Sequence, residues 1–145
     1  MVPASTHSRC CTIVLEEEMP LARIDIVRGK SADYKRTIAD VVYEAMLDTI
    51  KAPVNDRFQV ISEHAAEDQI ADENYLGIKR TQDHVFIQLT ISAGRSVEQK
   101  QAYYKAVVDG LHERLGLRRE DVFINLVEVA KENWSFGNGV AQYVS

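Results

Sequence analysis

Pro20, which directly follows Met19, is the residue best suited to chemistry in this sequence. Cells remove an initiator methionine when the next residue is small, proline included, so a start at Met19 would leave Pro20 with a free secondary amine. An ordinary α-amino group has a pKa of roughly 7.7–8, and burial in an apolar pocket beside a cation lowers it. Such an amine can move a proton at carbon next to a carbonyl, or form an iminium with an aldehyde or ketone. The plain alternative is that Pro20 only begins an edge strand, where proline is tolerated.

The segment before Pro20, residues 1–19, differs from the rest of the chain. It reads MVPASTHSRCCTIVLEEEM and ends in a glutamate run followed by Met19. Glutamate codons make a purine-rich stretch, and purine-rich stretches precede bacterial start codons. We therefore hypothesise that residues 1–19 come from a misplaced start. A genuine N-terminal extension is the alternative, and the intact mass of the native protein distinguishes the two.

Other signals for chemistry are weak. The sequence has no glycine-rich phosphate loop, no HExxH and no GxSxG motif. His64, His84 and His112 are scattered, and we expect surface or structural roles for them. The adjacent Cys10 and Cys11 cannot form a disulfide framework or a zinc site. We therefore expect neither a metal nor another cofactor.

Length and composition restrict the class of protein. The chain has 145 residues, 46% of them hydrophobic and 27% charged, which fits one globular domain. Its 17 basic and 22 acidic residues give a net charge of −5 without a basic stripe, which argues against a nucleic-acid partner. No apolar run approaches the roughly 20 residues needed to cross a membrane. We expect a cytoplasmic protein without membrane or nucleic-acid partners.

An internal repeat at an offset of 65 residues organises the chain after Met19. Gly29-Lys30-Ser31 matches Gly94-Arg95-Ser96, and the match extends without a gap. Because the order of predicted elements also agrees, we interpret the two halves as a duplicated unit. The further matched pairs are Ile26 and Ile91, Lys35 and Lys100, Val42 and Val107, Asp56 and Asp121, Phe58 and Phe123, and Glu63 and Glu128.

The first half has the hydrophobic periods of a strand, a helix and a second strand. Apolar residues alternate over residues 22–26, as in a half-buried strand. From Ser31 onward they recur every three or four residues, which predicts an amphipathic helix that ends before Pro53. Alternation returns over residues 58–62, which predicts the second strand.

The second half shows the same order of periods. Residues 85–91 alternate as a strand, and residues 122–127 form the last predicted strand. Between them, Ser96 and Gln99 are typical of a capping box at the start of a helix, and Gly116 is suited to its C-cap.

The order strand–helix–strand predicts a βαβ unit with parallel strands and a right-handed crossover. Two such units predict an α/β fold, with a four-stranded sheet and both helices on one face. We expect a single domain over residues 20–145, made of repeats 20–83 and 84–145. The polar segment 65–83 is the predicted linker between the repeats.

The other face of this sheet is predicted to be uncovered. Burying one face of the sheet does not account for four of the apolar side chains in the predicted strands. An exposed apolar face normally binds another protein surface. We therefore expect self-association through it. The four residues are Ile61, Phe86, Ile124 and Leu126.

Several segments resemble a known family. The run MPLARI over residues 19–24 is similar to the opening of the tautomerase superfamily, whose members are built from βαβ units and use an amino-terminal proline. The duplicated unit resembles its long-chain branch, which is typically trimeric. The segments 53–59 (PVNDRFQ), 91–96 (ISAGRS) and 134–137 (WSFG) resemble malonate semialdehyde decarboxylase. The resemblance implies a tautomerase-like fold and a homotrimer.

The resemblance also implies roles for individual residues. Pro20 matches the catalytic proline, and Asp56 matches the acid that supports its charge state or orients water. Arg95 matches the arginine that holds a substrate carboxylate, a task suited to a planar bidentate donor. Trp134 and Phe136 match the apolar wall of the pocket. The plain alternatives are a turn residue for Asp56, a solvated residue for Arg95 and packing for the two aromatic residues.

One departure from the decarboxylase pattern concerns charge. That pattern has a second arginine where this chain has Ala93, and a proline where it has Gly94. The loss of a cation that polarises a carbonyl or holds a carboxylate argues against efficient malonate semialdehyde decarboxylation. Arg57, Lys79 or Arg80 are the candidates to replace it.

The functional hypothesis is a cofactor-independent tautomerase-superfamily isomerase or lyase. It uses Pro20 as an acid or base on a small oxo acid, as a keto–enol tautomerase or a malonate semialdehyde decarboxylase. The alternative is a non-catalytic trimeric binding or scaffold protein. In that case the N-terminal extension would keep the nitrogen of Pro20 in a peptide bond, without basicity.

Overall fold

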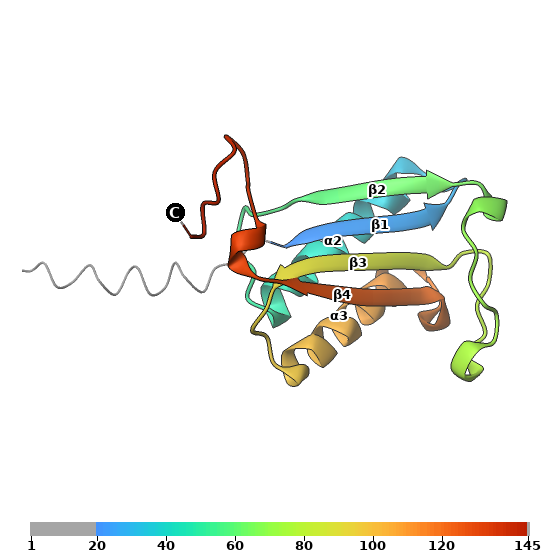
Figure 1. Cartoon of the computed structure of the whole chain (residues 1–145). Helices are drawn as coiled ribbons and strands as arrows, with labels where there is room; N and C mark the ends of the chain where they lie inside the picture. Colours follow the sequence, from blue (N-terminus) through green and yellow to red (C-terminus); the bar gives the residue numbers. More distant parts are fainter. Residues whose placement is uncertain (1–19, 145) are drawn as a thin grey trace, which may run out of the picture.

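The computed structural model describes residues 20–144 and shows a four-stranded sheet with two helices packed against one face (Figure 1). The predicted α/β fold is confirmed. The strand order across the sheet is β2-β1-β3-β4. The elements are β1 (Leu21–Val27), α2 (Ala32–Thr49), β2 (Gln59–His64), β3 (Val85–Ser92), α3 (Val97–Leu115) and β4 (Val122–Val129).

The strand pairing decides which chain segments meet. β1 is parallel to β2 and β3 is parallel to β4, and each pair is connected by its helix. β1 and β3 are antiparallel at the centre of the sheet, where Ile24 pairs with Ile87. The starts of β1 and β2 therefore lie at the same end of the sheet as the finishes of β3 and β4 (Figure 1).

The two helices begin and end as their sequences predict. The Ser31 hydroxyl accepts a hydrogen bond from the Tyr34 backbone N–H at the start of α2. Ser96 and Gln99 form a reciprocal capping box at the start of α3. Gly116 ends α3 with a φ of +68°, a left-handed conformation that glycine adopts without strain.

The two halves also repeat an ion pair. Lys35 on α2 contacts Glu63 on β2 at 3.3 Å, and Lys100 on α3 contacts Glu128 on β4 at 2.9 Å. The residues of one pair lie 65 positions from those of the other. In each half a lysine of the helix thus contacts an edge strand of the sheet, as expected for a duplicated unit.

The core lies between the sheet and the helices, and it corrects one prediction. Ile61, Ile124 and Leu126 pack against this core and not on the uncovered face. They belong to edge strands, so the helices cover them only in part, but they point to the same side as the fully buried residues of β1 and β3. Of the four predicted residues, Phe86 lies on the open face, in edge-to-face contact with Phe123 at 5.3 Å.

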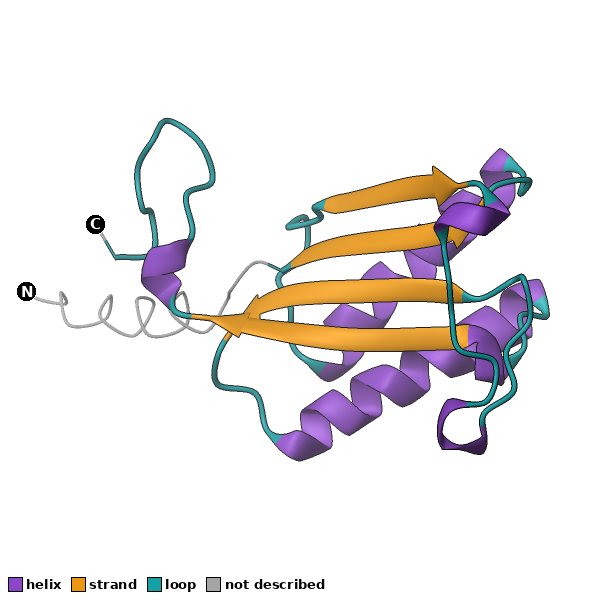
Figure 2. Ribbon diagram, turned by 45° about the vertical axis from the view of Figure 1, so that its right-hand side comes forward, coloured by secondary structure: helices purple, strands orange, loops and turns teal. Residues whose placement is uncertain are grey.

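The helices leave the other face of the sheet uncovered (Figure 2), and two polar side-chain pairs lie on this open face. His64 and Asp25 form a pair at 2.6 Å, and the Gln88 amide donates to Asn125 at 2.9 Å. The apolar residues of this face gather towards its two ends. Within residues 20–144, no helix is long and apolar enough to cross a membrane.

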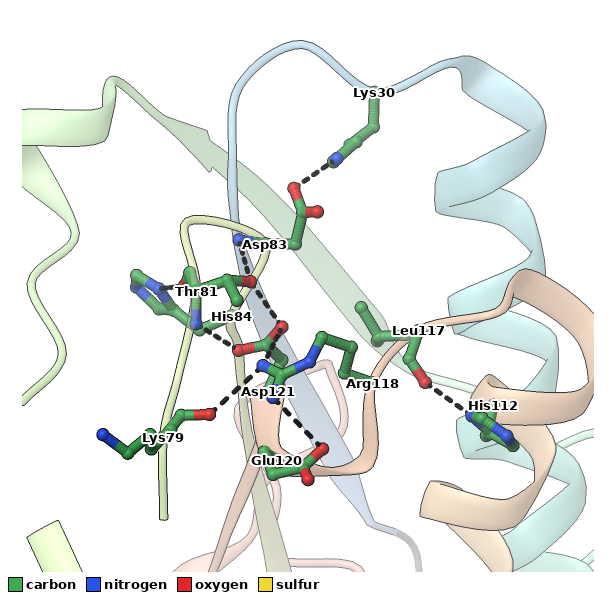
Figure 3. Close-up of polar contacts among 10 residues, drawn as sticks. All are labelled: Lys30, Lys79, Thr81, Asp83, His84, His112, Leu117, Arg118, Glu120 and Asp121. Atoms are coloured by element: carbon green, nitrogen blue, oxygen red, sulfur yellow. Dashed lines mark hydrogen bonds and ion pairs between the residues drawn. The ribbon is translucent and has the colours of Figure 1, made fainter. Parts of the chain in front are cut away.

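The segment between the repeats is fastened to the second half (Figure 3). Thr81 donates its backbone N–H and its hydroxyl to the Asp121 carboxylate, at 2.7 and 2.6 Å. Asp121 is fully buried. Arg118 donates to the Lys79 carbonyl at 3.1 Å, so the chain around Thr81 has a defined place beside the start of β4.

Candidate active site

Four segments that are distant in the sequence meet at one end of the sheet. Pro20 precedes β1, and residues 53–58 precede β2. Residues 93–96 follow β3, and residues 134–144 follow β4 after a short 3₁₀ turn. Each segment carries residues that the sequence singled out, and the strand pairing brings them to this end.

Pro20 lines a cavity of about 240 Å³ at this end of the sheet. Pro20 itself is buried, whereas Phe58 on the rim of the cavity is 48% exposed. The lining is mainly apolar, and such surroundings disfavour a charged amine. The other lining residues are Leu21, Trp134, Ser135 and Phe136.

Trp134 and Phe136 form an aromatic wall of this cavity. Their rings stack with centroids 5.5 Å apart and an interplanar angle of 15°. Phe136 also contacts Tyr143 edge-to-face at 4.9 Å. The Trp134 indole N–H donates to the Ser92 hydroxyl at 3.0 Å, which fixes the wall to the finish of β3. The structure thus brings two of the predicted site residues to Pro20.

The C-terminal tail holds the wall in place. The side chain of Gln142 accepts from the Phe136 backbone N–H at 3.0 Å and donates to the Gly137 carbonyl at 2.9 Å. Asn138 and Gly139 have φ values of +62° and +69°, as in the tight turn that Asn-Gly favours. These contacts close the tail into a loop that supports Phe136.

Arg95 lies at the same end but is not among the lining residues of this cavity. Its Nε and Nη2 atoms both donate to the Ile50 carbonyl at 3.2 Å, and Nη1 donates to the Ser92 carbonyl at 3.1 Å. Ile50 is the C-cap of α2, where a cation stabilises the exposed carbonyls. Arg95 therefore fastens the end of α2 to the finish of β3, and its role towards a substrate remains a prediction.

Asp56 is half-buried in the turn before β2, and it too lies outside the lining of the cavity. Its backbone N–H donates to the Pro53 carbonyl at 3.4 Å. Within residues 20–144 its carboxylate accepts no hydrogen bond, in contrast to that of its repeat mate Asp121. The catalytic role of Asp56 likewise remains a prediction.

Ser92 is a site residue that the sequence reasoning missed. It is 1% exposed, its hydroxyl holds Trp134 and its carbonyl holds Arg95. The repeat offset contained a signal, because Ser92 occupies the place of Val27 in the first half. A serine where the matching repeat has a valine needs a polar partner when it is buried.

The three histidines have structural contacts, as predicted. His64 pairs with Asp25, while ring nitrogens of His84 and His112 contact backbone carbonyls at 2.9 and 3.1 Å. In the described part of the chain, no cluster of three or more His, Cys, Asp or Glu residues could hold a metal ion. The predictions on Cys10 and Cys11 lie outside the described residues.

Comparison with known proteins identifies the family. Two family models, both described as tautomerase enzyme, match residues 20–79 and residues 56–137. The chain belongs to the tautomerase superfamily. The probable tautomerase YusQ of Bacillus subtilis (strain 168) is 36% identical over 126 residues, which cover 87% of this chain and 99% of the relative. The probable tautomerase YrdN of the same organism is 31% identical over 127 residues, which cover 88% and 98%. The protein is thus an enzyme of the tautomerase superfamily.

Solved structures agree with this assignment. FG41 malonate semialdehyde decarboxylase inhibited by 3-bromopropiolate is 40% identical to this tautomerase-superfamily chain, with a TM-score of 0.80. The match covers 86% of this chain and 94% of that one. A second malonate semialdehyde decarboxylase is 32% identical with a TM-score of 0.78, covering 85% and 95%. A fused 4-OT symmetric trimer, 24% identical with a TM-score of 0.71, shares the fold over 85% of this chain and 97% of that one.

Proposed function

We propose that Pro20 transfers a proton to or from carbon next to a carbonyl in a small oxo acid, without a cofactor. The position of Pro20 in an apolar cavity against the stacked Trp134 and Phe136 carries this proposal. The cavity of about 240 Å³ suits a small ligand. An apolar lining disfavours the charged form of a free proline amine, and a lowered pKa suits an amine that transfers protons.

Keto–enol tautomerisation is the reaction that requires the fewest functional groups in this site. In the ketonisation of phenylenolpyruvate, the protonated Pro20 nitrogen donates its proton to C3, and the C2–C3 double-bond pair forms the new C–H bond. The enol O–H bond breaks, its proton goes to solvent, and its electron pair completes the C2 carbonyl. The neutral Pro20 amine then takes a proton from solvent, so the number of protons is unchanged overall. This reaction needs only one amine and one anchored carboxylate.

Decarboxylation of malonate semialdehyde is the second candidate, supported by the likeness to two solved decarboxylases. The bond between C2 and the carboxylate breaks, carbon dioxide leaves, and the electron pair moves towards the aldehyde oxygen. Pro20 then donates a proton to C2 and acetaldehyde results. This route develops negative charge on oxygen, which a cation must stabilise.

Arg95 and Asp56 complete the proposed site. Arg95 places a guanidinium beside Ser92, the residue that also holds Trp134, and we assign it the substrate carboxylate. Asp56 supports the charge state of Pro20 or orients a water molecule. Its carboxylate is not engaged elsewhere within residues 20–144, which supports this role.

The proposal requires a free nitrogen on Pro20. We propose that the mature domain spans residues 20–145 and that residues 1–19 are absent from it. In support, one family match begins at residue 20, and alignments of 126 and 127 residues cover nearly all of two relatives. Labelling with 3-bromopropiolate and peptide mapping tests this: a modified Pro20 supports a free and reactive nitrogen, and an unmodified Pro20 contradicts it.

Activity measurements test the role of Pro20 directly. We expect Pro20→Ala to abolish the best activity among phenylenolpyruvate ketonisation, malonate semialdehyde decarboxylation and hydration of an acetylenic acid. Circular dichroism of Pro20→Ala beside the wild-type protein checks that the variant is folded. Full activity of Pro20→Ala would remove proline catalysis from the account.

We further propose that the enzyme acts as a cytoplasmic homotrimer. The uncovered sheet face and the likeness in fold to trimeric proteins support this assembly. Analytical ultracentrifugation tests it, and a monomer at micromolar concentration would contradict it.

A further inference from the structure

A second cavity lies at the opposite end of the sheet from Pro20. It has a volume of about 280 Å³ and lies beside the starts of β3 and β4. We call this surface the Phe123 end, after a residue that is 45% exposed there. Its apolar residues are unusually open to solvent, with Ile70 81% and Tyr75 63% exposed. The lining residues are Ile70, Ala71, Asp72, Tyr75, Arg80, Phe86 and Phe123.

A closed trimer needs two different interaction surfaces on each copy, and this chain has an exposed apolar patch at each end of its sheet. In a three-fold ring each copy presents one surface to one neighbour and a different surface to the other. The Pro20 end has an exposed Phe58 beside its cavity, and the Phe123 end has exposed aromatic and aliphatic side chains. If the Phe123 end of each copy packs against the Pro20 end of its neighbour, both apolar patches are buried in all three copies.

Arg80 is the cation among the residues that line this cavity, and few of its polar atoms have partners. Its Nε is buried without a hydrogen-bond partner in the described part of the chain. Its Nη1 makes only a long contact, 3.5 Å, to the Asp72 carbonyl. The Asp72 carboxylate also lies at this cavity, but it accepts from the Asn74 N–H and forms no ion pair with Arg80 among residues 20–144.

The other two candidates for the missing cation are less suited. Arg57 lies near the Pro20 end, but it forms an ion pair with Asp40 at 2.7 Å and lies over the Tyr43 ring at 4.7 Å. Lys79 is exposed and lies outside the cavity of the Phe123 end. Arg80 is therefore the candidate with unused hydrogen-bonding capacity beside a cavity.

Arg80 cannot reach Pro20 of its own chain. It precedes the start of β3, where Val85 pairs with Ile26 near the finish of β1. Pro20 lies before the start of β1, and seven strand residues span about 20 Å. Only the Arg80 of another copy can approach the cavity.

We propose that Arg80 of one copy enters the Pro20 cavity of the neighbouring copy and supplies the cation that Ala93 lacks. This inference rests on the proposed function and on the trimer, and it concerns the same small oxo acid. The guanidinium binds a substrate oxygen, either of the carboxylate or of the carbonyl, as planar Arg donors do. Each site then contains a proline from one subunit and an arginine from the next.

Kinetics of Arg80 variants form the first test. Loss of a hydrogen bond to a charged group predicts a kcat/KM that is about 10- to 100-fold lower for Arg80→Ala. Arg80→Lys should recover part of this loss. Lys79→Ala, which removes the adjacent exposed cation, should change kcat/KM less than about 2-fold. Arg80→Met retains the length of the side chain and replaces Arg80→Ala if that variant does not form trimers.

Mixed trimers decide between a contribution within one chain and one between chains. Pro20→Ala and Arg80→Ala subunits are co-expressed with different affinity tags, and trimers that carry both tags are purified. In a three-fold ring every mixed trimer has one pocket that combines an intact Pro20 with the intact Arg80 of its neighbour. We expect about a third of the wild-type kcat from such trimers, whichever subunit is in excess.

The outcomes separate the two proposals. Full activity of the Pro20→Ala trimer overturns the proposed function itself. An inactive Pro20→Ala trimer together with an unaffected Arg80→Ala trimer overturns only the role of Arg80. Mixed trimers that are no more active than the Arg80→Ala trimer overturn the contribution between chains.

Discussion

Asp56 and Asp121 occupy the same place in the two repeats but have different surroundings, and a matched pair of substitutions tests this difference. The Asp121 carboxylate is fully buried and accepts two hydrogen bonds from Thr81 (Figure 3). The Asp56 carboxylate is half-buried and accepts none within residues 20–144. We expect Asp121→Asn to reduce stability and Asp56→Asn to reduce activity.

The magnitude for Asp121 follows from its two bonds. A hydrogen bond to a charged group contributes about 1.5–3 kcal/mol and a neutral one about 0.5–1.5 kcal/mol. An asparagine can still accept from the Thr81 N–H, and its amide can donate to the Thr81 hydroxyl. Asp121→Asn therefore loses about 1 kcal/mol per bond, or about 2 kcal/mol of the free energy of unfolding. For Asp56→Asn we expect less than about 0.5 kcal/mol.

Urea unfolding of both variants and of the double variant measures these free energies. A loss of about 2 kcal/mol corresponds to a melting temperature about 4–8 °C lower for a domain of this size. Steady-state kinetics at a temperature well below the transition then measure kcat/KM. Asp56→Asn should lower kcat/KM at least about 10-fold, which corresponds to 1.4 kcal/mol of transition-state stabilisation. Asp121→Asn should change it little.

Equal losses of stability in the two variants would refute the reasoning, because it depends on the different hydrogen bonding of the two carboxylates. Wild-type kinetics of a well-folded Asp56→Asn variant would refute the catalytic role of Asp56. The two results are independent, so one prediction can fail while the other holds.

Three further substitutions have defined expectations. Tyr103→Phe should raise the free energy of unfolding by about 1 kcal/mol, because the buried Tyr103 hydroxyl has no partner within residues 20–144. Burial also raises the pKa of the Tyr103 phenol, so wild-type stability should be complete below the unfolded-state pKa of about 10 and fall as pH rises above it. Denaturation between pH 8 and 11 should show that this slope is reduced in Tyr103→Phe. Gly110→Ala should destabilise by about 1–3 kcal/mol, since the new Cβ would lie 2.8 Å from Val41 Cγ1, and Val41→Ala should remove the clash in a double-mutant cycle. Trp134→Phe loses the 3.0 Å hydrogen bond from the indole N–H to Ser92. Expressed as free energies, the loss in kcat/KM should exceed the loss in stability to unfolding. Equal losses would assign the indole to packing alone.

Features governed by contacts within short segments were readable from the sequence. The helix that begins after Ser31, the capping box of Ser96 and Gln99 and the C-cap at Gly116 follow from backbone groups that neighbouring residues satisfy. The order strand–helix–strand in each half predicted parallel pairing, and the repeat offset predicted that both halves share a fold. The resemblance to the tautomerase superfamily implied that Pro20 and the C-terminal aromatic residues share a pocket, whereas the antiparallel pairing of β1 with β3, which brings them to one end of the sheet, was not predicted.

Features that depend on contacts between distant segments required the tertiary structure. Alternation alone did not show that Ile61, Ile124 and Leu126 point to the helices, because two-residue periodicity does not say which face is covered. The hydrogen bonds of Arg95 to the end of α2 join residues 45 positions apart, and no local pattern contains them. The placement of Arg80 at the far end of the sheet likewise follows from strand register. Residue types and local periods thus determined the elements and the candidate chemistry, whereas packing decided which side chains are free to act.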